Sequence, residues 1–144
     1  MLWVGFVCVF LYQTSLGLEL KTNAISGWAT IGDSRKYYRS KAEYRYACYL
    51  QWLKQQGAIV SWSHEPKTFW FEGIRRGTVS YKPDFLVVER NSHHWVEVKG
   101  YMDARSKTKI NRFKRYFPEE QLIVIDSKWY KRNSGKLKNL IPGW

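Results

Sequence analysis

The sequence predicts an α/β sandwich around a mixed sheet. A stretch with helical periodicity, Ser40–Gln56, precedes several short strand-like runs, and a second one, Asp103–Phe117, precedes a last apolar run, Gln121–Asp126. Successive short strands favour antiparallel pairing, whereas a strand, a helix and a further strand favour a parallel crossover. At 144 residues, of which 44% are hydrophobic, the chain is long enough for one domain with its own core.

The N-terminal part is expected to lie outside that domain. Leu2–Tyr12 is an apolar run too short to span a bilayer as a helix. It fits a secretory signal, an extension outside the domain, or a buried strand or short helix, and these alternatives stay open. Lys21–Asp33 is polar and contains glycine, which is typical of a linker. We therefore divide the chain into an extension with a linker, residues 1–35, and a folded domain, residues 36–144.

The first helix is marked by its apolar stripe and its ends. Its apolar residues recur every three to four positions, and Gly57 follows as a stop signal. Ser40 and Glu43 fit a capping box, in which the two residues satisfy N–H groups of the first turn. The alternative is that Glu43 approaches a site on the neighbouring strands.

Three strand-like pieces follow: Ala58–Trp62, Lys67–Phe71 and Thr78–Tyr81. His64 and the other two histidines, His93 and His94, are interpreted as turn residues because none has a ligand partner at a recognisable spacing.

The glycine-rich segment between the last two pieces favours a tight reversal. Arg75 and Arg76 lie at its tip, where they either contact a phosphate backbone or form a solvated basic turn.

The stretch Tyr81–Gly100 carries the candidate chemistry. Phe85–Glu89 and His94–Lys99 are predicted to form a hairpin through the polar turn between them. With the turn centred between Asn91 and Ser92, Asp84 lies opposite Lys99, and Asp84, Glu97 and Lys99 share one face of the sheet.

Two carboxylates at a strand end are hard oxygen ligands for Mg²⁺ or Mn²⁺, and a nearby lysine can orient a water or neutralise a developing charge. The alternative is an exposed strand with a Glu/Lys pair.

The second helix combines a buried stripe with a basic face. Asp103 is its expected N-cap, and Pro118 follows its end. Six basic residues and no acidic one occupy positions 105–115, which favours phosphate contact. We expect DNA contacts from four of them: Lys107, Lys109, Arg112 and Arg115.

The C-terminal part is apolar and then basic. Gln121–Asp126 is predicted to be a strand buried on both faces. In Lys128–Lys138, Lys131 and Arg132 are expected to contact the DNA backbone, with Trp129 and Tyr130 stacking on bases or sugars.

Composition supports an anionic partner. The formal net charge is +12, and such an excess suggests nucleic acid. The two cysteines, Cys8 and Cys48, show neither a metal spacing nor a disulfide framework, so the sequence gives no reason to expect an oxidising compartment.

Pro83-Asp84 and Glu97-Val98-Lys99 resemble the motif of the PD-(D/E)xK nuclease superfamily. Within it, the chain is most similar to the phage endonuclease I family of Holliday-junction resolvases. The segments that carry this resemblance are YRSKAE (Tyr38–Glu43), YKPDFLV (Tyr81–Val87), VEVKG (Val96–Gly100) and LIPGW (Leu140–Trp144).

The resemblance implies a restriction-endonuclease-like αβββαβ core, with a mixed sheet flanked by helices, over residues 36–144. It implies Mg²⁺, with Mn²⁺ as a substitute, held by Asp84, Glu97 and the Val98 carbonyl, with Glu43 completing the site and Lys99 assisting the attacking water. Arg39 belongs to the matching segment and is expected to contact DNA.

The resemblance also implies a homodimer that cuts branched DNA in the cytoplasm of a bacterial or phage-infected cell, without a small-molecule cofactor or a membrane. The family has a further acid where this chain has Ser61 and Ser63, and Glu65 is the nearest acid. A restriction-, transposon- or repair-type nuclease, or a catalytically silent basic DNA-binding module, are the alternatives.

Overall fold

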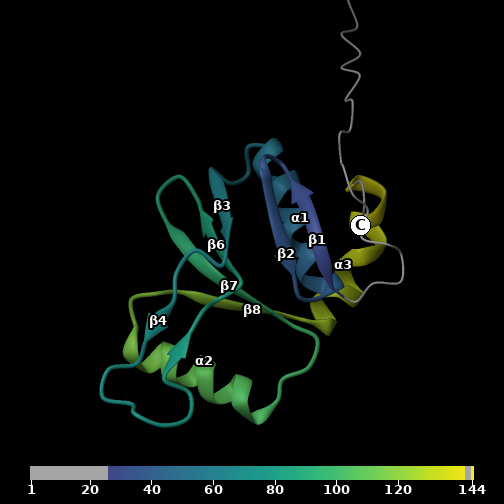
Figure 1. Ribbon diagram of the computed structural model, residues 1–144. Helices are drawn as coiled ribbons and strands as arrows, with labels where there is room; N and C mark the ends of the chain where they lie inside the picture. Colours follow the sequence, from purple (N-terminus) through teal and green to yellow (C-terminus); the bar gives the residue numbers. More distant parts are fainter. Residues whose placement is uncertain (1–25, 142–143) are drawn as a thin grey trace, which may run out of the picture.

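The computed structural model describes residues 26–141 and 144, so the run Leu2–Tyr12 and Cys8 lie outside the described residues (Figure 1). The strands are β1 (Gly27–Ile31), β2 (Ser34–Tyr38), β3 (Ser61–His64), β4 (Phe69–Trp70), β5 (Ser80–Tyr81), β6 (Phe85–Val88), β7 (His93–Lys99) and β8 (Leu122–Asp126). The helices are α1 (Lys41–Gln55), α2 (Ala104–Tyr116) and α3 (Ser127–Leu140). Within the described residues, none of these helices is long and apolar enough to cross a membrane.

A four-stranded mixed sheet organises the fold. Its strand order is β3-β6-β7-β8, with antiparallel pairs β3/β6 and β6/β7 and a parallel pair β7/β8. Helix α2 makes the crossover between the two parallel strands. The predicted mixed α/β fold is therefore confirmed at this level.

The sheet lies between α1 and α3 on one side and α2 on the other (Figure 1), and a hydrophobic cluster fills the space on each side. One face packs against α1 and α3, with Phe85, Val87 and Val96 at its centre. The other face packs against α2 and the β4–β5 pair through an aromatic cluster that includes Phe69, Trp95 and Phe113. Side chains alternate along each strand, so neighbouring residues of β6 and β7 enter different layers.

The expected linker is wrong for residues 27–33. These residues form β1 and the turn into β2, and the resulting hairpin packs on α1 through Ala29, Ile31 and Tyr38. Gly32 makes this turn with a φ of +59°, a conformation that glycine adopts without a steric cost. The polar composition of β1 and β2 gives no clear strand signal in the sequence. The predicted domain boundary at residue 36 is also wrong, because it falls inside β2.

The C-terminal basic segment also differs from the expectation. It forms α3, capped by the Asp126 side chain, which accepts from the Trp129 N–H at 2.9 Å. The Trp129 ring packs against Tyr46 and Tyr49 of α1, and the Tyr130 hydroxyl donates to the Ala42 carbonyl at 2.6 Å. Trp144 packs on both rings, so these aromatics hold the helix on the core instead of facing a ligand.

Two strands deviate in position or burial. The strand predicted at Ala58–Trp62 begins at Ser61, because residues 58–60 are bends after the end of α1. Strand β8 was expected to be buried on both faces, but it is an edge strand in which Ile123 is exposed. The β4–β5 pair is confirmed, in shorter form than predicted.

Candidate active site

Buried polar side chains gather at one place in the molecule. Among the residues that the structure describes, the buried polar or charged ones, tyrosine aside, are Glu43, His64, Asp84 and Glu97. They come from the start of α1, the end of β3, the residue before β6, and β7. Acidic residues are almost never fully buried without partners or a function, so this group is the candidate site.

The hairpin register places the two strand carboxylates on the same face. Phe85 pairs with Val96, so the next position along the ladder sets Asp84 opposite Glu97. The predicted pairing of Asp84 with Lys99 is wrong by two residues because the turn is centred between Arg90 and Asn91, as the hydrogen bond from Glu89 N–H to the Ser92 carbonyl at 2.8 Å shows. A shift by two residues preserves the face, so Asp84, Glu97 and Lys99 still point to one side.

Asp84 is held by two donors and destabilised by its surroundings. Its Oδ2 accepts from the Val98 N–H at 2.7 Å, and its Oδ1 accepts from Arg39 Nη2 at 3.2 Å. Burial, followed by the charge of Glu97, raises the pKa of Asp84 to about 7. The Val98 N–H and Arg39 therefore do not fully offset the cost of ionising Asp84 beside Glu97.

The backbone N–H and carbonyl of Val98 point towards β6, on the side of Asp84. The Val98 N–H points towards β6, and in a strand the N–H and carbonyl of one residue point to the same side. The residue across from Val98 in this register is Pro83, which has no N–H to donate to the Val98 carbonyl. The proline therefore leaves that carbonyl oxygen without a ladder bond from β6.

Glu97 has a partner on each oxygen. Tyr81 donates its hydroxyl to Oε2 at 2.7 Å, and Lys99 Nζ lies 2.9 Å from Oε1. Burial alone would lower the pKa of Lys99, but the neighbouring Glu97 carboxylate outweighs it and raises that pKa. Lys99 thus keeps its proton and acts as a cation and hydrogen-bond donor in this state.

Glu43 takes part both in the helix cap and in the site. The Glu43 N–H donates to Ser40 Oγ at 3.1 Å, and Glu43 Oε2 accepts from the Arg39 N–H at 2.9 Å. Its other oxygen, Oε1, lies 2.6 Å from His64 Nε2. The Ser40 half of the predicted capping box is therefore confirmed, whereas the Glu43 side chain binds the N–H of the residue before the cap and reaches His64 of β3.

His64 is a site residue that sequence reasoning missed. The expectation of a turn residue is wrong, because His64 ends β3 and is buried between Tyr38 and Phe85. Glu43, His64 and Glu65 have ligand atoms within 4.8 Å of one another. The available signal was the alternation of Trp62 and His64 along the strand, which turns both towards α1.

Glu65 joins the group through the backbone and two cations. Its N–H donates to the Asp84 carbonyl at 2.8 Å, and its φ is +47°. Its carboxylate pairs with Arg39 and with Lys82 Nζ, the latter at 2.7 Å. Arg39, expected to contact DNA, thus bridges Glu65 and Asp84 at the site.

The other predicted DNA contacts are spread over the surface. Arg75 and Arg76 are exposed in the loop between β4 and β5. Exposed positions of α2 and α3 carry the further basic side chains Lys107, Arg115, Lys131 and Arg132, with Lys109 partly buried. Arg112 is partly buried and donates to the Thr78 carbonyl, so it ties α2 to the residues before β5.

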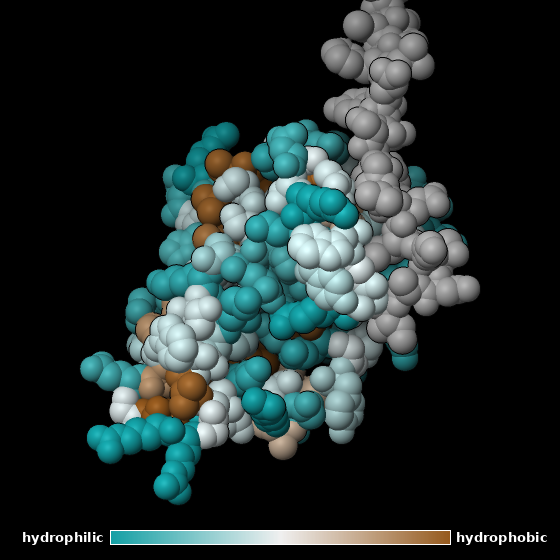
Figure 2. Space-filling model, viewed as in Figure 1, coloured by the Kyte–Doolittle hydropathy of each residue, from teal (hydrophilic) through white to brown (hydrophobic). Residues whose placement is uncertain are grey.

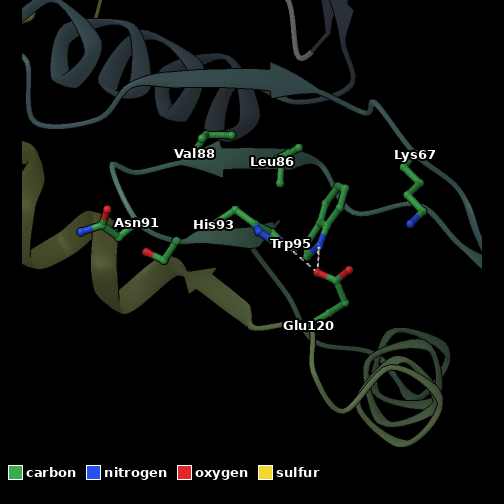
Figure 3. Close-up of a pocket in the computed structure, with 8 residues that line it drawn as sticks. Lys67, Leu86, Val88, Asn91, His93, Trp95 and Glu120 are labelled. Atoms are coloured by element: carbon green, nitrogen blue, oxygen red, sulfur yellow. Dashed lines mark hydrogen bonds and ion pairs between the residues drawn. The ribbon is translucent and has the colours of Figure 1, made fainter.

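An open depression with a volume of about 490 Å³ lies elsewhere on the α2 side of the sheet (Figure 3). In it, Glu120 accepts from Trp95 Nε1 at 2.7 Å and pairs with His93 Nε2 at 2.9 Å, and Lys67 stands at its rim. Since the four buried polar residues do not line it, we do not assign the chemistry to it.

The fold and the site define a mixed α/β protein with a buried group of carboxylates and a histidine, and with a partly buried lysine beside them. The chain belongs to the family described as "Protein of unknown function (DUF1064)", which it matches over residues 30–132. No curated protein matches the chain. The matched range contains the complete group of buried polar residues and Lys99.

Proposed function

We propose that this chain is a metal-dependent DNA endonuclease of the PD-(D/E)xK type that hydrolyses phosphodiester bonds in branched DNA. The observation that supports this proposal best is the burial of Asp84 and Glu97 on one sheet face, with Lys99 beside them. Burying two carboxylates together costs free energy, so a functional role accounts for an arrangement that stability alone disfavours.

The donor set fits a hard divalent cation. Asp84, Glu97 and the Val98 carbonyl would hold Mg²⁺, and Mn²⁺ can substitute, because all three donors are oxygens. The proline opposite Val98 leaves the Val98 carbonyl without a partner from β6, and burial and the Glu97 charge, which raise the pKa of Asp84, are effects that a bound cation would offset. When bound, the cation would supply Lewis-acid stabilisation of charge on the phosphate and acidify a water.

The remaining residues have roles that follow from their contacts. Lys99, protonated and 2.9 Å from Glu97, would orient the attacking water and stabilise the negative charge that develops on the phosphate. Glu43, fixed by the helix start and His64, would add a further carboxylate at the edge of the site. Arg39, whose side chain is 59% exposed, can bind a phosphate that enters the site.

DNA would be bound by exposed basic residues around this centre. The net charge of +12 and the basic faces of α2 and α3 support backbone binding that weakens with added salt. A homodimer would place two such sites on one branched substrate, as the resemblance implies. In the same proposal, the protein acts in the cytoplasm of a bacterial or phage-infected cell.

The test compares a four-way junction, a linear duplex and a single strand, each with and without Mg²⁺. We expect cleavage of the junction that requires Mg²⁺, and that is abolished in Asp84→Asn and Lys99→Ala while DNA binding is largely retained. Glu119→Gln, which changes an exposed acid, is the matched control and should cut at the wild-type rate. Cutting by either site variant at near wild-type rate would exclude this assignment.

A catalytically silent DNA-binding module is the second candidate. It is favoured by the ion pairs of Arg39 and Lys82 with the acids of the site, because they neutralise part of the charge without a metal. Binding of all three DNA forms without cleavage in Mg²⁺ or Mn²⁺ would support this candidate.

A further inference from the structure

The β1–β2 hairpin presents two large aromatic side chains to solvent. Trp28 and Tyr37 are directly opposite each other in the register, with ring centroids 5.7 Å apart and an interplanar angle of 71°. The Trp28 residue is 57% exposed and Tyr37 is 44% exposed. Each ring therefore keeps solvent-exposed surface on which a further planar group can stack.

A basic group adjoins this aromatic pair. The Arg35 guanidinium lies 5.6 Å from the centre of the Trp28 ring, whereas Lys36 points to the other side of the hairpin by strand alternation. In Figure 2, pale residues of intermediate hydropathy over the hairpin adjoin strongly hydrophilic ones. Exposed aromatic faces next to cations are the combination that binds unpaired bases, because stacking holds the base while the cations hold the phosphates.

The pair lies at the end of the hairpin that leads into the candidate site. Tyr37 is two residues before Arg39, which is roughly 7 Å along an extended chain. Arg39 in turn contacts Asp84. A strand bound with its phosphate near Arg39 therefore has an adjacent base within reach of Trp28 and Tyr37.

A cleft follows the other side of the hairpin. Its volume is about 580 Å³, and it is bounded by the hairpin turn, α1 and the end of β3, including Lys36, Lys54, His64 and Glu65. It opens beside the site and carries two lysines from facing elements, so it offers a path for a phosphate backbone. Neither the aromatic pair nor this cleft is needed to hold a cation at Asp84 and Glu97.

We propose that Trp28 and Tyr37 form a stacking platform for an unpaired nucleotide of the DNA strand that enters the site. The inference rests on the proposed function in that the bound strand is the substrate, and it specifies that substrate as DNA with unpaired bases next to the cleaved phosphate. The β1–β2 hairpin thus binds unpaired bases by stacking and does not distinguish one base from another.

The experiment measures binding of fluorescein-labelled dT15 and of a 15-base-pair duplex by fluorescence anisotropy, in EDTA so that no cleavage occurs. Trp28→Ala should weaken binding of dT15 by about tenfold, as expected for the loss of one stacked base, and binding of the duplex by less than about twofold. Trp28→Phe retains a ring and should recover most of the affinity. Trp70→Ala is the matched control, because Trp70 is 67% exposed on β4, outside the hairpin, and should change neither.

Each outcome decides the inference. Equal losses on both DNA forms, a Trp28→Ala variant that behaves like Trp70→Ala, or a wild-type chain that does not bind dT15 would overturn it. Cleavage of a four-way junction, assayed in parallel with Mg²⁺, separates the two proposals: binding of dT15 that depends on Trp28, without any cleavage of the junction in Mg²⁺ or Mn²⁺, would exclude the nuclease and leave the platform in place.

Discussion

Removing the charge of Asp84 should stabilise the protein without divalent cations. In the folded state, burial and the neighbouring Glu97 raise the pKa of Asp84 from 3.8 to about 7, roughly 3 units. At about 1.4 kcal/mol per unit, ionising this group in the folded protein costs on the order of 4 kcal/mol more than in the unfolded chain. Asp84→Asn removes that cost at pH 8.

The substitution also weakens contacts. The amide keeps one oxygen for the Val98 N–H, which Asp84 accepts at 2.7 Å, but it loses the charged contact with Arg39 at 3.2 Å. A hydrogen bond to a charged group contributes roughly 2 kcal/mol. The pKa of about 7 already includes the favourable effects of the Val98 N–H and Arg39, so this loss is not subtracted again, and the expected net gain at pH 8 in EDTA is on the order of 4 kcal/mol in the free energy of unfolding.

The effect must depend on pH with a defined sign. Between pH 3.8 and about 7 the folded wild type binds more protons at Asp84 than the unfolded chain, so its stability falls as pH rises through this window. The advantage of Asp84→Asn should consequently disappear at about pH 4 and be complete above pH 7. Urea unfolding at pH 4, 6 and 8 measures it, with Asp33→Asn, an exposed residue of the β1–β2 turn, as the control.

Adding Mg²⁺ at pH 8 should raise the stability of the wild type and leave Asp84→Asn nearly unchanged, because a ligand stabilises the state that binds it. An Asp84→Asn variant less stable than the wild type at pH 8 as well as at pH 4 would refute the reasoning, since the carboxylate would then contribute favourable contacts and no net cost.

Two further substitutions address the partners of the carboxylates. His64→Leu should lower the free energy of unfolding by about 1–3 kcal/mol and raise the Mg²⁺ concentration needed for cleavage, because Glu43 loses a buried partner. His64→Gln keeps an N–H donor and should restore both the stability and the Mg²⁺ requirement. Equal Mg²⁺ requirements in the two variants would show that His64 only packs against its neighbours. Tyr81→Phe removes the donor to Glu97 and should cost about 1–2 kcal/mol in urea unfolding at pH 8, whereas an unchanged midpoint would show that this hydrogen bond contributes nothing.

The parts of the fold that local physics determines could be predicted from the sequence. Helices α1 and α2 begin at the expected caps, Ser40 and Asp103, because a side-chain oxygen there accepts from an N–H of the first turn. The hairpin β6–β7 follows from two apolar runs with a polar turn. Its register was wrong by two residues because the sequence does not determine which polar residues make the turn.

Elements that depend on tertiary contacts could not be predicted in this way. Helix α3 has more basic than apolar residues, and it is held by Trp129 packing on Tyr46 and Tyr49, which are distant in sequence. From the sequence alone, Trp129 and Tyr130 are therefore predicted to stack on DNA, whereas both pack on the core. The β1–β2 hairpin likewise depends on α1 to cover Ala29 and Ile31.

The candidate site shows the same division. Strand alternation predicts that Glu97 and Lys99 share a face, and Asp84 joins them because the predicted and the observed turn are both centred between two residues. The contact of His64 with Glu43 joins β3 to α1, and nothing in the local sequence indicates it. The roles of all these residues in catalysis remain predictions.

Pro83 sets the point at which strand pairing stops. The pairing of β6 with β7 ends at Phe85 and Val96, and Pro83 offers no N–H to extend it, although Val98 and Lys99 stay paired with β8. Replacing Pro83 with alanine would supply a backbone N–H opposite Val98 and allow β6 and β7 to pair over one further position. The missing N–H of Pro83 thus leaves the Val98 carbonyl, which we propose as a metal ligand, without a hydrogen bond from the neighbouring strand.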